Sequence, residues 1–137
     1  MAQNAALLLV EIPRTNDKKE LSAGQMFAAL HGILKPKKSI FNETYLLQDR
    51  ISFEIAAIGQ RIRFYIWVPE HLQAFVEGQV YAQYPTAQIS SVNDDYTERP
   101  LQQMVIYSTE LVLTDNETLP IKTFPSFEVD PLAAITA

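Results

Sequence analysis

The hydrophobic period of the chain changes at a single residue, Pro69. Residues 61–68, RIRFYIWV, alternate apolar side chains with other side chains, as a β-strand does. Residues 70–84 instead repeat their apolar side chains at the helical spacing of about 3.6. Proline suits the first position of a helix, where its missing N–H is not needed. The sequence therefore predicts a strand that runs directly into a helix, and this helix buries Leu72, Phe75, Val76 and Val80 and ends before Pro85.

A second alternating run, residues 51–58, precedes this strand and is separated from it by Gly59-Gln60. Glycine first in a two-residue loop is typical of a type II′ hairpin turn. A loop of this length sets the register of the two strands, and the expected pairs are Ala57 with Ile62, Ile55 with Phe64, Phe53 with Ile66 and Ile51 with Val68. One face of the hairpin is then apolar throughout. The other face carries Arg61, Arg63, Tyr65 and Trp67 from the second strand, opposite Ile58, Ala56, Glu54 and Ser52.

The remaining elements complete an α+β fold. Residues 6–12 and 87–92 predict strands, and 103–114 predicts a further, longer strand. A helix begins near Ser22, with Gln25 completing a capping box and Leu21 packing against Met26, and it ends at Lys35-Pro36. Its expected buried stripe comprises Met26, Phe27, Leu30, Ile33 and Leu34.

The order β-α-β-β-α-β, with one extra C-terminal strand, is that of the ferredoxin-like fold: an antiparallel sheet with two helices on one face. We expect this domain to span residues 1–114. The tail, residues 115–137, contains Pro120, Pro125 and Pro131 without a sustained period and is expected to be a linker.

Composition excludes several classes of protein. The chain has 137 residues, of which 47% are hydrophobic and 20% charged, which is the balance of one globular domain. Its net charge of -5 argues against a protein that grips phosphate backbones, because that requires clustered lysine and arginine. There is no cysteine, which excludes disulfides and thiolate metal sites. The apolar run at residues 5–10 is far shorter than the ~20 residues that a membrane span needs.

Motifs that carry chemistry are not found in this sequence. His31 and His71 each lack a second ligand at metal spacing. The acidic turn with Asp94, Asp95 and Glu98 fits no calcium loop and is expected to be solvated. With four glycines, neither dinucleotide-binding nor P-loop motif is present. We expect no catalytic residue, no cofactor and no metal in this chain.

The row of Arg61, Arg63, Tyr65 and Trp67 is the one candidate interaction site, because a ferredoxin-like sheet often leaves the face away from its helices bare. Two interpretations stay open. Exposed tryptophan, tyrosine and arginine are enriched in protein–protein contacts; alternatively the aromatic rings pack across the sheet and Arg63 pairs diagonally with Glu54. Binding of single-stranded nucleic acid by stacked aromatics is disfavoured by the net charge and by the lack of the Gly-aromatic motif of such modules.

Several stretches resemble the N-terminal region of large ATPases of bacterial type IV secretion and conjugation, the DNA-coupling type. They are LLLVEIPRTNDKK, QMFAALHGIL, ISFEIAAIGQRIRFYIWVPEHLQAFVEGQVYAQYP and LPIKTFPSFEVDPLAAIT, and they cover almost the whole chain. In that family the region precedes a P-loop ATPase domain, which would bind ATP in full-length relatives. No Walker A lysine or Mg-binding aspartate is present here, so hydrolysis is not carried over to any residue, and the chain is expected to be a piece of a longer protein.

The resemblance implies a non-catalytic accessory domain that supports assembly by docking to protein partners or to itself. It also implies a cytoplasmic location, at the inner face of the membrane, without insertion into the bilayer. The alternative from another class is a stand-alone ferredoxin-like module that binds a small ligand or single-stranded nucleic acid.

Overall fold

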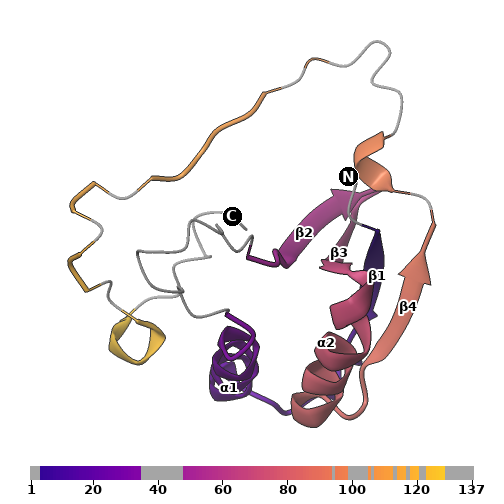
Figure 1. Ribbon diagram of the computed structural model, residues 1–137, viewed down its shortest axis with the longest axis horizontal. Coiled ribbons are helices and arrows are strands. Elements are labelled where there is room, and N and C mark those ends of the chain that lie inside the picture. The colour runs from indigo at the N-terminus through magenta and orange to yellow at the C-terminus, as the bar shows by residue number, and fades with distance from the viewer. Residues whose placement is uncertain are drawn as a thin grey trace, which may run out of the picture. The chain divides into compact units, whose positions relative to one another are not determined.

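The computed structural model describes residues 4–34, 48–93, 95–98, 105, 107–112, 114–116, 118–120 and 123–128 (Figure 1). The chain divides into two compact units, residues 1–99 and 100–137, and each is treated by itself. All helices and strands of the expected ferredoxin-like domain, apart from the extra strand, lie in the first unit.

The first unit is an antiparallel sheet with two helices packed on one face. The strands are β1 (Ala5–Glu11), β2 (Ser52–Ile58), β3 (Arg61–Pro69) and β4 (Gln88–Val92), and the helices are α1 (Glu20–His31) and α2 (Glu70–Gln83). The four strands lie side by side in the order β2-β3-β1-β4, and every neighbouring pair is antiparallel (Figure 1). This confirms the predicted α+β fold, with an antiparallel sheet and two helices over one face.

The β2–β3 hairpin has the predicted register but a different turn. Ala57 pairs with Ile62, Ile55 with Phe64 and Phe53 with Ile66, as expected, whereas Ile51 precedes the first residue of β2. Gly59 and Gln60 both have positive φ, 56° and 61°, which is the pattern of a type I′ turn and not of the predicted type II′. Both turns have two central residues, so the register is the same for either.

Helix α1 is shorter than predicted, and its start differs. It begins at Glu20 with Lys19 at the N-cap and no side-chain capping hydrogen bond, so Ser22 lies inside the first turn and the expected capping box is wrong. It ends at His31, with Gly32 at the C-cap, before the expected stop at Lys35-Pro36. Of the predicted stripe, Met26 and Leu30 are buried, Ile33 is half-buried, and Phe27 and Leu34 are exposed.

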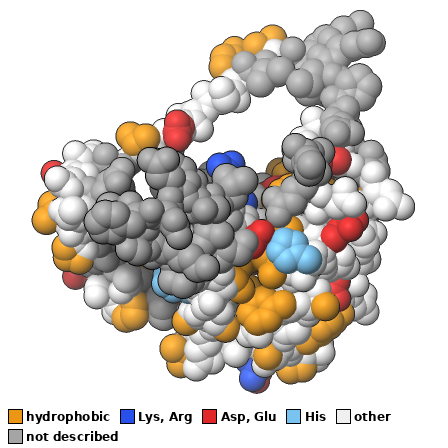
Figure 2. Space-filling model, in the orientation of Figure 1, with side chains coloured by type: hydrophobic (Ala, Val, Ile, Leu, Met, Phe, Trp, Pro, Cys, Tyr) orange, Lys and Arg blue, Asp and Glu red, His pale blue; other side chains and the backbone are white. Residues whose placement is uncertain are grey.

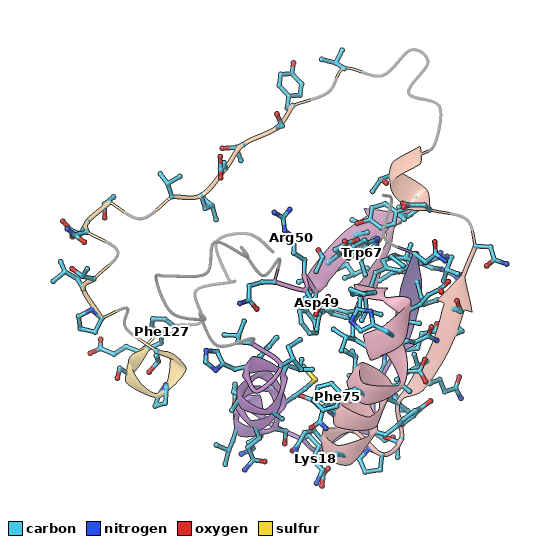
Figure 3. All side chains as sticks on the ribbon, viewed as in Figure 1. Lys18, Asp49, Arg50, Trp67, Phe75 and Phe127 are labelled. Carbon is cyan, nitrogen blue, oxygen red and sulfur yellow. The ribbon has the colours of Figure 1, made fainter. Side chains whose placement is uncertain are left out.

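Helix α2 follows β3 without a loop, as the change of period at Pro69 predicts. Val76 and Val80 are buried and Leu72 is half-buried, whereas Phe75, which is labelled in Figure 3, is 38% exposed. The main core lies between the helices and the sheet and consists of Leu8, Val10, Met26, Leu30, Ile66, Val68, Val76, Val80 and Ala87.

The second unit shows no strand among its described residues. Val105 and residues 107–112, which fall in the strand expected over 103–114, have no regular secondary structure. Tyr107 is 91% and Leu111 88% exposed, and no strand lies among the described residues of this unit for this apolar alternation to pack on. Within 115–137, the described part forms one short 3-10 turn, Phe124–Ser126. The two units divide before the boundary that we expect at residue 114.

None of the helices in the described part of the chain combines the length and apolar character that a membrane crossing requires.

Candidate functional site

The outer face of the hairpin, which faces away from the helices, is more buried than the sequence indicates. Tyr65 is only 4% exposed, and the ring of Tyr96 stacks on it with centroids 5.0 Å apart and an interplanar angle of 28°. Tyr96 belongs to the short 3-10 turn that follows β4, Tyr96–Glu98. The segment after the fourth strand therefore folds back over the sheet face that the sequence leaves bare.

A hydrogen bond ties this segment to the hairpin. The Tyr96 hydroxyl donates to Oε2 of Glu54 at 2.7 Å. Burial, and next the bond to the Glu54 carboxylate, raise the pKa of Tyr96 to about 12. Glu54 therefore pairs with a tyrosine, and no ion pair joins it to Arg63 among the described residues. The predicted diagonal ion pair between Arg63 and Glu54 is therefore wrong. The interpretation that aromatic rings pack across this face is correct for Tyr65.

The two arginines of the predicted row lie nearer the turn. Arg61 is exposed and Arg63 is half-buried. The Tyr65 hydroxyl, and to a lesser degree the Glu11 carboxylate, raise the pKa of Arg63. The register places the four residues Arg61, Arg63, Tyr65 and Trp67 on one sheet face, as predicted, but the burial of Tyr65 divides them into two separate exposed parts.

Trp67 is half-buried and lines an open pocket of about 720 Å³ on this face. Figure 3 shows Trp67 with Asp49 and Arg50 at the same end of the hairpin. The pocket is lined by Leu7, Asp49, Arg50, Ile51, Ser52, Glu54, Trp67, Asp95 and Thr97. It therefore combines one guanidinium with three carboxylates and one aromatic ring.

Asp95, the one acidic residue of the turn beside this pocket whose side chain is described, is hydrogen-bonded within that turn. Asp95 accepts hydrogen bonds from the backbone N–H of Thr97 at 2.8 Å and from its hydroxyl at 2.7 Å, and these bonds lower the pKa of Asp95. Asp94 and the side chain of Glu98 lie outside the described residues. His71 Nε2 lies 3.4 Å from Oδ1 of Asp49, and His31 is exposed. Within the described ranges, no cluster of three or more possible metal ligands occurs.

The opposite face of the same hairpin carries large apolar side chains that reach solvent. Ile55 is 64%, Ile62 62%, Phe64 50% and Phe53 40% exposed. These four residues are neighbours, because Ile55 pairs with Phe64 and Phe53 lies two residues before Ile55 on the same face. We call them the hairpin patch. The two helices lie over this face, as expected, but they leave the part of the hairpin near the turn exposed.

The helices stop short of the patch because their buried side chains meet the other end of the strands. Met26 and Leu30 of α1 and Val76 and Val80 of α2 form one cluster with Ile66 and Val68, the last apolar residues of β3. Phe27 reaches furthest, and its ring makes an edge contact with Phe53 at 4.9 Å. Apolar side chains also reach the surface over α2 in Figure 2.

The exposure of the patch was not predicted, because the alternation of a strand indicates which residues share a face and does not indicate what covers that face. A signal was present nevertheless: Gly32 is a common type of residue at a helix end. A helix of twelve residues is about 18 Å long, too short to cover two strands along their whole length together with the turn.

Comparison with known proteins identifies no relative. No family model, no curated protein and no solved structure matches this chain.

Proposed function

We propose that this domain is a protein-docking module and that the hairpin patch is its contact surface. The observation that carries the proposal is the exposure of Ile55, Ile62 and Phe64, each half or more exposed on two neighbouring strands. Contiguous exposed apolar patches, unlike single exposed apolar residues, mark interaction sites on soluble proteins. Scattered apolar residues are normal, but four neighbours on one sheet face are not scattered.

The energetics of the patch suit a contact of moderate strength. Full burial of a leucine-sized or phenylalanine side chain contributes about 1.5–3 kcal/mol. Each of the four side chains is still about half exposed, so its burial on binding can contribute roughly half of this free energy. The patch as a whole can therefore contribute about 4 kcal/mol. A stable complex needs further contacts around the patch, and the edge of β2 and the ring of Phe27 are the nearest elements that can provide them.

The narrower proposal is that this docking serves assembly of a type IV secretion or conjugation ATPase, in which the domain is a non-catalytic accessory part. The resemblance of its sequence to the N-terminal region of such ATPases supports this context. Nucleotide binding would belong to a domain outside this chain. The proposed contact surface is the hairpin patch on the opposite face, because Tyr65 is buried. It therefore differs from the surface expected from the sequence, the row of Arg61, Arg63, Tyr65 and Trp67.

The alternative function, binding of a small ligand or of single-stranded nucleic acid, would use the Trp67 pocket. An aromatic ring beside a guanidinium, as with Trp67 and Arg50, favours a planar anionic ligand. The carboxylates of Asp49, Glu54 and Asp95 line the same pocket and oppose a phosphate backbone. Titration with a labelled oligonucleotide at low and high salt tests this alternative, because electrostatic binding must weaken steeply as salt rises.

The docking proposal is tested with a photo-crosslinking amino acid in place of Ile62, introduced into the native host. The captured protein is then purified and titrated with the wild-type domain, with the double variant Ile62→Ser/Phe64→Ser, and with Tyr81→Ser. Tyr81 is 41% exposed on α2 and provides a matched control outside the patch. We expect the double variant to weaken binding at least tenfold and the control to leave it unchanged. Equal effects of the two, or no captured protein that binds after purification, would contradict the proposal.

A further inference from the structure

We propose that β2 pairs antiparallel with β2 of a second copy of this chain, centred on Ile55, and joins the two four-stranded sheets into one. This inference rests on the proposed docking function, because β2 carries half of the hairpin patch. Three features of the strand support this inference. They are the direction of its backbone hydrogen-bonding groups, the lack of residues in it that would block pairing at the edge, and the complementarity of its side chains when it pairs with its own copy.

The outward backbone groups of β2 belong to the same residues as its apolar side chains. In a two-residue hairpin, the pair that flanks the loop, here Ile58 and Arg61, exchanges both of its hydrogen bonds. Alternate residues then point their N–H and C=O groups to opposite sides of the strand. Phe53, Ile55 and Ala57 therefore direct these groups away from β3, toward the side where β2 has no neighbouring strand among the described elements.

The residues of β2 themselves lack the features by which strands prevent edge pairing. Exposed edges are commonly blocked by lysine, proline, a bulge or inward-pointing charge. The sequence of β2, SFEIAAI, has none of these except Glu54, whose carboxylate is bonded to Tyr96 on the opposite sheet face. The other edge of the sheet, β4, reads QISSV, is shorter and is largely polar. Of the two edges, β2 is the one suited to pairing.

The strand is complementary to itself in one register. Only pairs of residues that both point outward can exchange hydrogen bonds, and centring on Ile55 is the one such register that matches all seven residues of β2. It places Phe53 against Ala57 of the copy, a large side chain beside a small one. It also places Glu54 against Ala56, so that like charges do not face each other.

This arrangement has a definite consequence for the hairpin patch. A two-fold axis perpendicular to the sheet keeps the helices of both copies on the same side. The two patches then meet across the axis and form one apolar floor between the helix pairs. One strand pair buries less than the 1,200–2,000 Å² of a standard interface, so we expect a dimer with a dissociation constant in the micromolar range.

The absence of cysteine from the chain allows a direct test. Ile55→Cys is treated with a short bis-maleimide across a concentration series, and Ser90→Cys, an exposed position on the β4 edge, serves as the matched control. We expect concentration-dependent crosslinked dimer for Ile55→Cys and at least tenfold less for Ser90→Cys. Equal crosslinking at both edges would overturn the proposal.

A second measurement is sedimentation equilibrium of the wild type, Ile55→Pro and Ala57→Lys. The N–H of Ile55 points away from β3, so proline removes a bond only from the dimer. Ala57 is exposed, and a lysine there blocks the edge if proline hinders folding. We expect both variants to weaken association at least tenfold. A wild type that stays monomeric at about 100 μM, well above the dissociation constant expected of such a contact, or a dimer that neither variant weakens, would overturn the pairing. The double variant Ile62→Ser/Phe64→Ser changes β3 and leaves β2 intact, so it should still dimerise. If it dimerises but no longer binds the partner protein, the result concerns the docking function and not the strand pairing.

Discussion

The two faces of the β2–β3 hairpin differ in burial from what their sequences indicate. On one face, the alternating apolar residues Ile55, Ile62 and Phe64 have the composition of a core but are half or more exposed. On the other face, Tyr65 follows a row of arginines and is only 4% exposed. The burial of each face depends on the element that packs on it. The two helices cover only part of the first face, and the turn that follows β4 packs on the second.

The alternation of a strand specifies which residues lie on each of its two faces, but it does not specify which layer packs above each face. Tyr96 lies 42 residues along the chain from Glu54, to which it is bonded. No sequence pattern near the hairpin predicts that contact. The exposure of the patch likewise depends on where α1 ends relative to the strands, which is a property of packing. The following variants test how different the two faces are.

The largest effect is expected for Tyr65→Ala. This change removes a buried aromatic ring from the contact with Tyr96 and leaves a cavity, so the free energy of unfolding should fall by about 3 kcal/mol. Urea unfolding followed by circular dichroism measures this loss. Phe64→Ala, which alters the opposite face, is the control and should cost less than about 1 kcal/mol. If the two losses are equal, the two faces do not differ as the structure indicates.

A smaller effect is expected for Tyr96→Phe, which removes only the hydrogen bond to Glu54. The free energy of unfolding should fall by about 1.5 kcal/mol, because the acceptor is a carboxylate. The stacked ring is retained, so near-ultraviolet circular dichroism should change little. Tyr96→Ala should lose more than Tyr96→Phe; equal losses would mean that the ring contributes nothing to covering this face.

The same tyrosine gives a pH dependence with a defined sign. Its pKa is about 12 in the folded protein and about 10 when unfolded. The folded state therefore holds the proton more tightly, and this stabilisation is present below pH 10 and is lost as the pH rises from about 10 toward 12. Ultraviolet titration of the phenols should show a late transition that Tyr96→Phe removes. If the wild type and Tyr96→Phe have the same titration curve apart from the loss of one phenol near pH 10, the cover over Tyr65 is open.

The turn that holds both faces in register provides a further prediction. Gly59 and Gln60 both have positive φ, and a side chain at Gly59 would meet no atom within 4 Å. Gly59→Ala should therefore cost about 1 kcal/mol through the backbone alone. Replacing the two residues by Asn-Gly, the pair preferred in type I′ turns, should stabilise the hairpin by up to about 1 kcal/mol. Destabilisation by Asn-Gly would argue for a type II′ turn.

The smallest effect on stability is expected for the exposed patch. Phe64→Ser should lower the free energy of unfolding by no more than about 1 kcal/mol, because half of the side chain is already exposed. It should nevertheless lower the binding of the dye ANS, which reports accessible apolar surface. Cooperative unfolding at much lower urea, with ANS binding unchanged, would show that Phe64 belongs to the core.

Much of the fold was predictable from the residues. The change of period at Pro69 places a strand directly before α2, and the two-residue loop sets the register of β2 and β3, because both are local properties of the backbone. The order of elements then leaves few ways to arrange one sheet and two helices, which is why the strand order follows. The type of turn was not predictable, because Gly59 suits either type and the conformation of Gln60 decides between them.

The candidate sites depended on contacts between distant parts of the chain. The residues that share each face of the hairpin follow from the sequence alone, since the period of two admits no other division. The cover of Tyr65 by Tyr96, and the contact of Ile55, Ile62 and Phe64 with solvent, follow only from the packing of the folded chain. Burial depends on the neighbouring layer, and the residues of that layer are encoded far along the chain from the strands they cover or leave open.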